Sequence, residues 1–172
     1  NSLTEVFVFG TVAGRNAALR AAGMEMPSPD ERELSDERER LELLGSTQDG
    51  EDIGELRREL RSAMWQGAGI IRGAEGLKET LDTVARLRER FKAVSVDSPA
   101  ELLRAIELFS MLTVGEVISR AALERTESRG AHYRADYPQE GDPEWLKNIV
   151  VSRRDGEMSI SESRVDLVRA KP

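Results

Sequence analysis

The apolar positions of this chain follow helical spacing over most of its second half. Apolar residues recur every three to four positions over about 52–71 and again over about 74–94. A third stretch, 102–123, is apolar on most sides and is therefore predicted to be the most buried helix. Three helices with short connections predict an antiparallel up-down-up bundle. In the first helix, Trp65 is expected to anchor the core rather than to serve as a platform for a ligand. In the second helix, the apolar residues spaced seven apart are Leu77, Val84 and Phe91.

Capping signals mark where the helices begin. Asp52 with Glu55, and Ser98 with Glu101, place an N-cap side chain three positions before a glutamate. The same spacing at Ser2 predicts an N-terminal helix that runs to about Ala22. Its small-residue face suggests tight packing, while the free amides at its start form a natural anion site.

A charged connector, 23–51, separates this helix from the bundle. It has a loop at 24–29, a Glu- and Arg-rich stretch at 30–44 that fits a short surface helix, and a second loop.

Further along, Asp142-Pro143-Glu144-Trp145 predicts a turn or short helix. The tail predicts a β-hairpin, turning at Asp155-Gly156 and ending near Leu167. Since a lone hairpin is marginal in water, it should pack on the bundle or on a partner.

The composition fits a helical, strongly solvated chain and narrows its partners. Charged residues make up 33% and aromatic residues 5% of the 172 residues, and the formal net charge is −7. Without a basic stripe, nucleic acid is not an expected partner. The absence of cysteine excludes disulfides and thiolate-held metals within this sequence. No apolar run is long enough to predict a membrane span.

One segment near the end of the third bundle helix concentrates unusual residues. The signature segment, Thr126–Pro138, contains the only histidine and both tyrosines of the sequence. Gly130 is able to adopt the left-handed conformation that terminates a helix, and Pro138 prevents continuation. We therefore expect the bundle helix to end at Gly130.

Two interpretations remain open for His132. Together with Arg129, Tyr133 and Arg134, it forms a set able to bind a carboxylate. Alternatively, His132 satisfies backbone carbonyls where the chain leaves the bundle. The two arginines suit a buried carboxylate partner or the free carbonyls of a helix end.

The signature segment, Glu-Ser-Arg-Gly-Ala-His-Tyr-Arg-x-Asp-Tyr-Pro, resembles the C-terminal region of succinate dehydrogenase and fumarate reductase flavoprotein subunits. The downstream Asp142-Pro143-Glu144-Trp145-Leu146-Lys147 and the start Asn1-Ser2-Leu3 extend the resemblance. It implies a mainly α fold: an N-terminal helix belonging to the flavin domain, the three-helix bundle and the hairpin tail. The implied division is 1–22 for the end of the FAD-binding domain, 23–51 for the connector, 52–135 for the bundle, and 136–172 for a strap and hairpin tail.

The same resemblance implies a function for the longer protein. Such subunits interconvert succinate and fumarate with FAD and pass electrons to an iron–sulfur subunit. Ser2 and Leu3 then correspond to the positions that contact FAD, whereas the residues that hold the dicarboxylate lie upstream. The expected partners are the chain's own N-terminal flavin domain and the iron–sulfur subunit. The expected location is cytoplasmic, with membrane association only through partner subunits. The signature segment is interpreted as a docking strap toward the flavin domain.

This sequence alone lacks the parts of a complete flavoenzyme. It has no Gly-x-Gly-x-x-Gly turn between a strand and a helix, so the isolated chain is expected to be inactive. Asn rather than Met at position 1 favours a piece of a longer protein. The alternatives are the C-terminal domain of L-aspartate oxidase, more distantly adenylylsulfate reductase, and a non-catalytic helical module that binds a protein partner.

Overall fold

The computed structural model describes residues 2–44, 50–154 and 157–165. The chain forms two compact units, Asn1–Glu39 and Arg40–Pro172. The first contains helix α1 (Ser2–Ala22) and most of α2 (Glu31–Leu44). The second contains the three long helices of the bundle and the strands.

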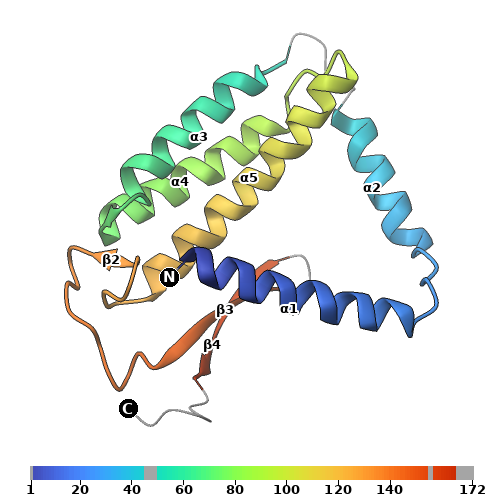
Figure 1. The fold of residues 1–172 in the computed structure, drawn as a ribbon. Helices are drawn as coiled ribbons and strands as arrows, with labels where there is room; N and C mark the ends of the chain where they lie inside the picture. The colour runs from blue at the N-terminus through green and yellow to red at the C-terminus, as the bar shows by residue number, and fades with distance from the viewer. Residues whose placement is uncertain (1, 45–49, 155–156, 166–172) are drawn as a thin grey trace. The chain divides into compact units, whose positions relative to one another are not determined.

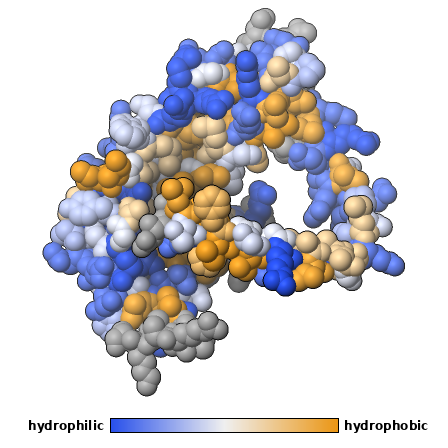
Figure 2. Space-filling model, in the orientation of Figure 1, coloured by the Kyte–Doolittle hydropathy of each residue, from blue (hydrophilic) through white to orange (hydrophobic). Residues whose placement is uncertain are grey.

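Helix α1 has the predicted bounds but covers none of its apolar side chains within its own unit. Apolar residues lie on all sides of its first three turns, and Figure 2 shows several of them open at the surface. A helix that is apolar all round is normally buried in a larger protein. The exposed large apolar residues of α1 are Leu3, Val6, Phe7, Val8, Phe9, Val12 and Leu19.

Helix α2 confirms the predicted surface helix in the charged connector. Asp30 caps it, because its carboxylate accepts hydrogen bonds from the amides of Arg32 at 2.8 Å and Glu33 at 3.4 Å. Near its end, Leu41 packs against the core of the bundle. Loop residues 45–49 lie outside the described residues.

Helices α3 (Ile53–Gly67), α4 (Ala74–Phe91) and α5 (Pro99–Glu124) form the predicted bundle and lie side by side in Figure 1. Asp52 and Ser98 are N-caps as predicted, accepting from the amides of Glu55 at 2.7 Å and Glu101 at 3.3 Å. The main core combines apolar residues of all three helices with Val94, which lies just after α4. Its buried members are Ile53, Leu56, Leu60, Val84, Leu87, Phe91, Val94, Ala105, Leu108 and Leu112.

Helix α3 ends at Gly67, four residues before the end that the apolar spacing predicts. Its backbone meets α4 there: a Cβ on Gly67 would lie 2.1 Å from both the carbonyl oxygen of Gly76 and Oγ1 of Thr80. Thr80 Oγ1 contacts the carbonyls of Ala63 and Gly76, at 3.2 and 2.8 Å. Glycine at position 67 therefore sets how closely α3 and α4 approach.

Burial differs from expectation on two helices. Helix α5 supplies the most buried residues of the bundle helices, six against five in α4 and four in α3, but its apolar Leu103, Val114 and Ile118 are exposed. These three side chains stay uncovered although α5 packs on α3, α4 and β3. Trp65 on α3, expected to anchor the core, is 74% exposed, so that prediction was wrong.

Two small sheets complete the second unit. Strands β1 (Ile71–Arg72) and β2 (Tyr133–Arg134) pair in parallel, an arrangement that the sequence did not predict. Strands β3 (Lys147–Arg154) and β4 (Glu157–Arg164) form the predicted antiparallel hairpin, which packs on α5 through β3. The predicted turn at Asp155-Gly156 and the predicted end near Leu167 lie outside the described residues. Residues 142–145 form the predicted turn.

Candidate functional site

The signature segment begins where α5 ends, but not in the predicted way. Helix α5 stops at Glu124, and Gly130 lies six residues later. Gly130 does adopt the left-handed conformation, with φ of +58°. Its role is a tight turn: the amides and carbonyls of Arg129 and His132 bond to each other at 2.7 and 3.0 Å. The prediction that Gly130 terminates the helix was therefore wrong.

Glu127 is the buried centre of the segment. Its side chain is 0% exposed and accepts hydrogen bonds from Nε and Nη2 of Arg129, each at 3.0 Å, and from Nη1 of Arg125. The backbone amide of Gly141 donates a further bond at 2.8 Å. Burial alone would raise the pKa of Glu127, but the bonds from Arg129, Gly141 and Arg125 outweigh it and lower the pKa to about 2. The carboxylate is therefore ionised at neutral pH, and both of its oxygens accept hydrogen bonds from the chain's own donors.

Arg134 closes the end of α5. Its side chain is 1% exposed, and Nη1 donates to the carbonyls of Ala122 at 2.7 Å, Leu123 at 3.0 Å and Arg125 at 3.1 Å. Those carbonyls have lost their helical partners at the C-terminus of α5, where a cation is also favoured by the helix dipole. The prediction that a segment arginine caps the helix end is confirmed for Arg134.

The same guanidinium reaches a second helix through Asp136. Nε and Nη2 of Arg134 form a two-bond pair with the Asp136 carboxylate, each bond 2.8 Å long. Oδ2 of Asp136 also accepts from the amide of Ala74, the first residue of α4, at 3.0 Å. The hydrogen bonds from Arg134, with that from Ala74, hold the pKa of Asp136 far below its usual range. One ion pair thus joins the C-terminus of α5 to the N-terminus of α4.

His132 lies between one hydrogen-bond donor and one acceptor, which together set its tautomer. Its Nδ1 is 3.1 Å from Nη1 of Arg72, and its Nε2 is 3.3 Å from the carbonyl oxygen of Arg125. Since arginine only donates, Nδ1 accepts and Nε2–H donates, so the ring is neutral. Burial lowers the pKa of His132, and the charges of Arg72, Arg125 and Arg134 add to that shift. This contact favours the interpretation in which His132 satisfies a backbone carbonyl.

The arginines and His132 of this segment are therefore engaged with the chain's own groups. Arg129 pairs with Glu127 and, at 2.5 Å, with Asp142. Arg125 extends the network to the hairpin by donating to the carbonyls of Trp145, at 3.3 Å, and Lys147. In the described part of the chain, no group of three His, Cys, Asp or Glu side chains is arranged to hold a metal ion.

Sequence reasoning missed Glu127 and Asp136 as the carboxylate partners of Arg129 and Arg134, and it missed Arg125 as a second cation that binds Glu127. Both carboxylates lie two residues from the arginine that they bind, but this spacing gave no sign that either would form a buried pair. Arg72, which holds His132, comes from 60 residues earlier in the chain. No local pattern identifies such a partner.

The predicted cofactor residues lie in the other unit, at the start of α1. Leu3 is 74% exposed, and the side chain of Ser2 lies outside the described residues. The first turn of α1 therefore presents an uncovered leucine beside the positive end of a helix of 21 residues.

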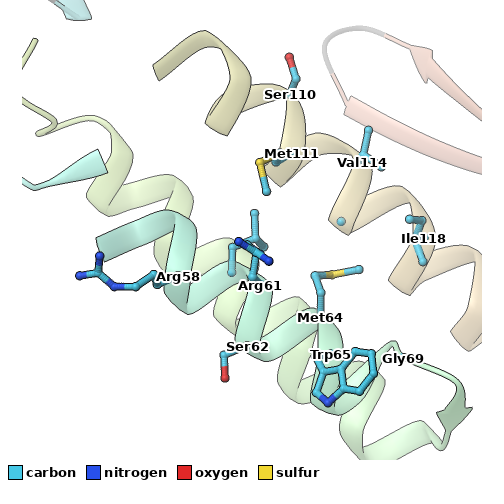
Figure 3. Close-up of a pocket in the computed structure, with 12 residues that line it drawn as sticks. Arg58, Arg61, Ser62, Met64, Trp65, Gly69, Ser110, Met111, Val114 and Ile118 are labelled. Carbon is cyan, nitrogen blue, oxygen red and sulfur yellow. The ribbon is translucent and has the colours of Figure 1, made fainter. Parts of the chain in front are cut away.

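A third feature is a groove of about 950 Å³ between α3 and α5 (Figure 3). Its wall combines apolar side chains of both helices with Arg58 and Arg61. Met64 forms part of the floor against α5: a Cβ on Gly115 would lie 3.2 Å from its sulfur. Figure 3 shows Trp65 at one end of the groove, near Gly69.

Among the described residues, no helix is long and apolar enough to cross a membrane.

Residues 57–172 match the family model described as "Fumarate reductase flavoprotein C-term". The fumarate reductase flavoprotein subunits of Haemophilus influenzae and Escherichia coli are 34% and 36% identical to the chain. Each comparison covers 100% of this chain and 30% of the relative. The chain thus spans less than a third of the length of these relatives.

Solved structures agree with this assignment. A chain of Escherichia coli quinol fumarate reductase superposes with a TM-score of 0.86 at 35% identity, covering 100% of this chain and 31% of that one. A chain of the Mycobacterium smegmatis Sdh1 complex gives 0.82 at 29% identity, covering 99% and 30%. An adenosine-5-phosphosulfate reductase, at 22% identity and 0.73, shares the fold. The chain therefore belongs to the C-terminal region of the succinate dehydrogenase and fumarate reductase flavoprotein family.

Proposed function

We propose that this chain forms the C-terminal part of an FAD-containing flavoprotein subunit that interconverts succinate and fumarate. The observation that carries the proposal is the similarity of the whole chain to fumarate reductase flavoprotein subunits, over 30% of their length. The closed network of the signature segment supports a structural role for this part. Its buried arginines and Glu127 are held by one another, so the dicarboxylate is bound by residues elsewhere in the longer protein.

The start of α1 fits one edge of a flavin site. In this proposal Leu3 and the first-turn amides from Ser2 onward would hold one edge of the flavin ring. The exposed Leu3 and the positive helix end both suit such a neighbour, since a reduced flavin carries negative charge there. When bound, FAD supplies the hydride chemistry; α1 would orient the ring and stabilise its charge.

The iron–sulfur subunit is the proposed electron acceptor, and the chain's own flavin domain is the second proposed partner. The structural relatives include a quinol-fumarate reductase with menaquinol molecules, at 34% identity. We extend that type of assembly to this protein, with a cytoplasmic flavoprotein that associates with a membrane only through its partner subunits. The isolated 172-residue chain would not be catalytic.

The test uses the full natural gene product that contains this sequence. We expect a yellow protein whose flavin absorbance is bleached by succinate and restored by fumarate. Bleaching by L-aspartate instead would move the protein to the L-aspartate oxidase branch. A colourless product that folds would refute the flavoprotein proposal and favour a helical module that binds a protein partner.

A matched experiment concerns the isolated chain. Titrating it into FAD and following flavin fluorescence should show no saturable binding, because α1 supplies only one edge of the site. Tight binding by the 172-residue chain would contradict the proposal that the rest of the site lies elsewhere.

A further inference from the structure

The groove between α3 and α5 has an apolar floor that no described part of its own unit covers. Val114 is 56% and Ile118 41% exposed on the α5 side, and Trp65 is 74% exposed on the α3 side. Met64 and Met111 line the groove between them. Methionine side chains adapt their shape to a neighbour, which makes such a floor suited to a packed partner segment.

The charged side chains of the groove all have one sign. Within the described chain, its lining includes Arg58 and Arg61 and no acidic residue. Arg58 pairs with Glu55 one turn earlier on α3. No carboxylate of the described residues forms an ion pair with Arg61, although the neighbouring Arg57 and Glu59 are both paired. Figure 3 shows the Arg61 side chain between the two helices.

We propose that this groove binds a segment of the longer polypeptide that precedes Asn1, and that the segment carries apolar side chains and a carboxylate facing Arg61. The inference rests on the proposed function, because it requires that the natural protein extend beyond this chain. It adds the surface on which the preceding part docks, which the family assignment does not give.

Two observations favour the same polypeptide over a separate protein. The whole chain aligns with relatives of which it covers only 30%. In a protein of that length, the larger part of the polypeptide must pack against some surface of this part. A covalently linked segment also docks at a high effective concentration and needs no long-range attraction. Charge complementarity then sets the register: a carboxylate opposite Arg61 would neutralise the one cation of the groove that lacks an ion pair in the described chain.

Hydroxyl-radical footprinting tests where the groove is covered. The 172-residue chain and the full natural gene product are oxidised in parallel, and modification of Trp65 and Met111 is quantified by mass spectrometry. We expect both residues to be modified about tenfold less in the longer protein, the change expected if the groove is covered about nine-tenths of the time. Leu103, which is 59% exposed on α5 but outside the groove, serves as the internal reference.

A charge-reversal pair identifies the role of Arg61. In the longer protein, Arg61→Glu should return Trp65 modification toward its value in the 172-residue chain, by about tenfold, because like charges at an interface oppose docking. Arg104→Glu is the matched control: Arg104 is also an exposed helix arginine, but it lies near the start of α5, outside the groove.

Three results would overturn the proposal. Equal modification of Trp65 in both proteins would show that nothing covers the groove. Protection that appears only when an iron–sulfur subunit is added would assign the groove to that subunit. Protection of the 172-residue chain that increases with its concentration would assign it to a second copy. Flavin absorbance of the same samples reports separately on the proposed function, so a colourless protein with a covered groove would refute that function alone.

Discussion

The signature segment and helix α1 differ in whether their side chains find partners within their own unit. The segment is rich in charge, yet Glu127, Arg134 and Asp136 are paired within the unit that contains them. Helix α1 is rich in apolar side chains, and seven large ones stay exposed. The signature segment has the residue types of a binding site, but its charged side chains hold the ends of α4 and α5 together. Helix α1 has few charged residues, and its exposed apolar side chains are the ones that require a neighbour. Chemical reactivity of residue types is a poor guide to which surface is free.

The largest expected effect comes from removing the cation that joins α4 and α5. Arg134→Met should destabilise the 172-residue chain by about 3 kcal/mol, because it leaves buried carbonyls and Asp136 without their partner. Urea unfolding followed by circular dichroism measures this. Arg104→Met, at an exposed position, should change the free energy of unfolding by less than about 0.5 kcal/mol. Equal effects of the two changes would remove the distinction between a closed and an open region.

Glu127→Gln should cost about 2 kcal/mol, since a neutral amide accepts weaker bonds from Arg125 and Arg129 and its NH₂ faces donors. The pH dependence follows from the same carboxylate. Its pKa is about 2 in the folded chain and near the ordinary 4.5 when unfolded. The unfolded state therefore binds the proton first, and stability falls as pH drops from about 4.5 toward 2. Glu127→Gln should make that fall shallower; an unchanged slope would contradict the assigned pairing.

His132 gives a smaller effect in a separate pH window. The folded pKa lies below the ordinary 6.5, so the neutral ring contributes stability that is fully present above pH 6.5. As the pH falls below 6.5 the unfolded state takes up the proton first, and this contribution is lost until the folded ring also protonates. Thermal unfolding between pH 7 and 5 should show a decline that His132→Gln abolishes. A variant that keeps the decline would place its origin in another group.

The smallest effect on folding is expected at α1. Phe7→Ser and Phe9→Ser should each change the unfolding free energy of the 172-residue chain by less than about 0.5 kcal/mol, because both side chains are already mostly exposed. Both variants should instead reduce self-association in sedimentation experiments. A large loss of stability would show that α1 is covered within this chain and would end the contrast with the signature segment.

The sequence predicted what depends on neighbours along the chain. Helical spacing, the caps at Asp52 and Ser98, and the hairpin at 147–164 follow from local rules and are confirmed. The β1–β2 pair and the bond from Ala74 to Asp136 join residues about 60 positions apart, and no local rule finds them. The error at Trp65 has a related cause, since burial depends on what faces a helix as well as on the residue itself. Ser2 and Leu3 stay predictions, because their neighbour would lie outside this chain.

The bond between Ala74 and Asp136 also has a consequence for the order of events in folding. The hairpin connections and helix caps of the bundle close over short stretches of chain, whereas this bond closes a loop of 62 residues. Such a contact forms after the helices have docked, so the signature segment should be unformed in the folding transition state. Arg134→Met should then accelerate unfolding and leave the refolding rate nearly unchanged. The segment would form late in folding, so it would determine the unfolding rate of the bundle and have little influence on its folding rate.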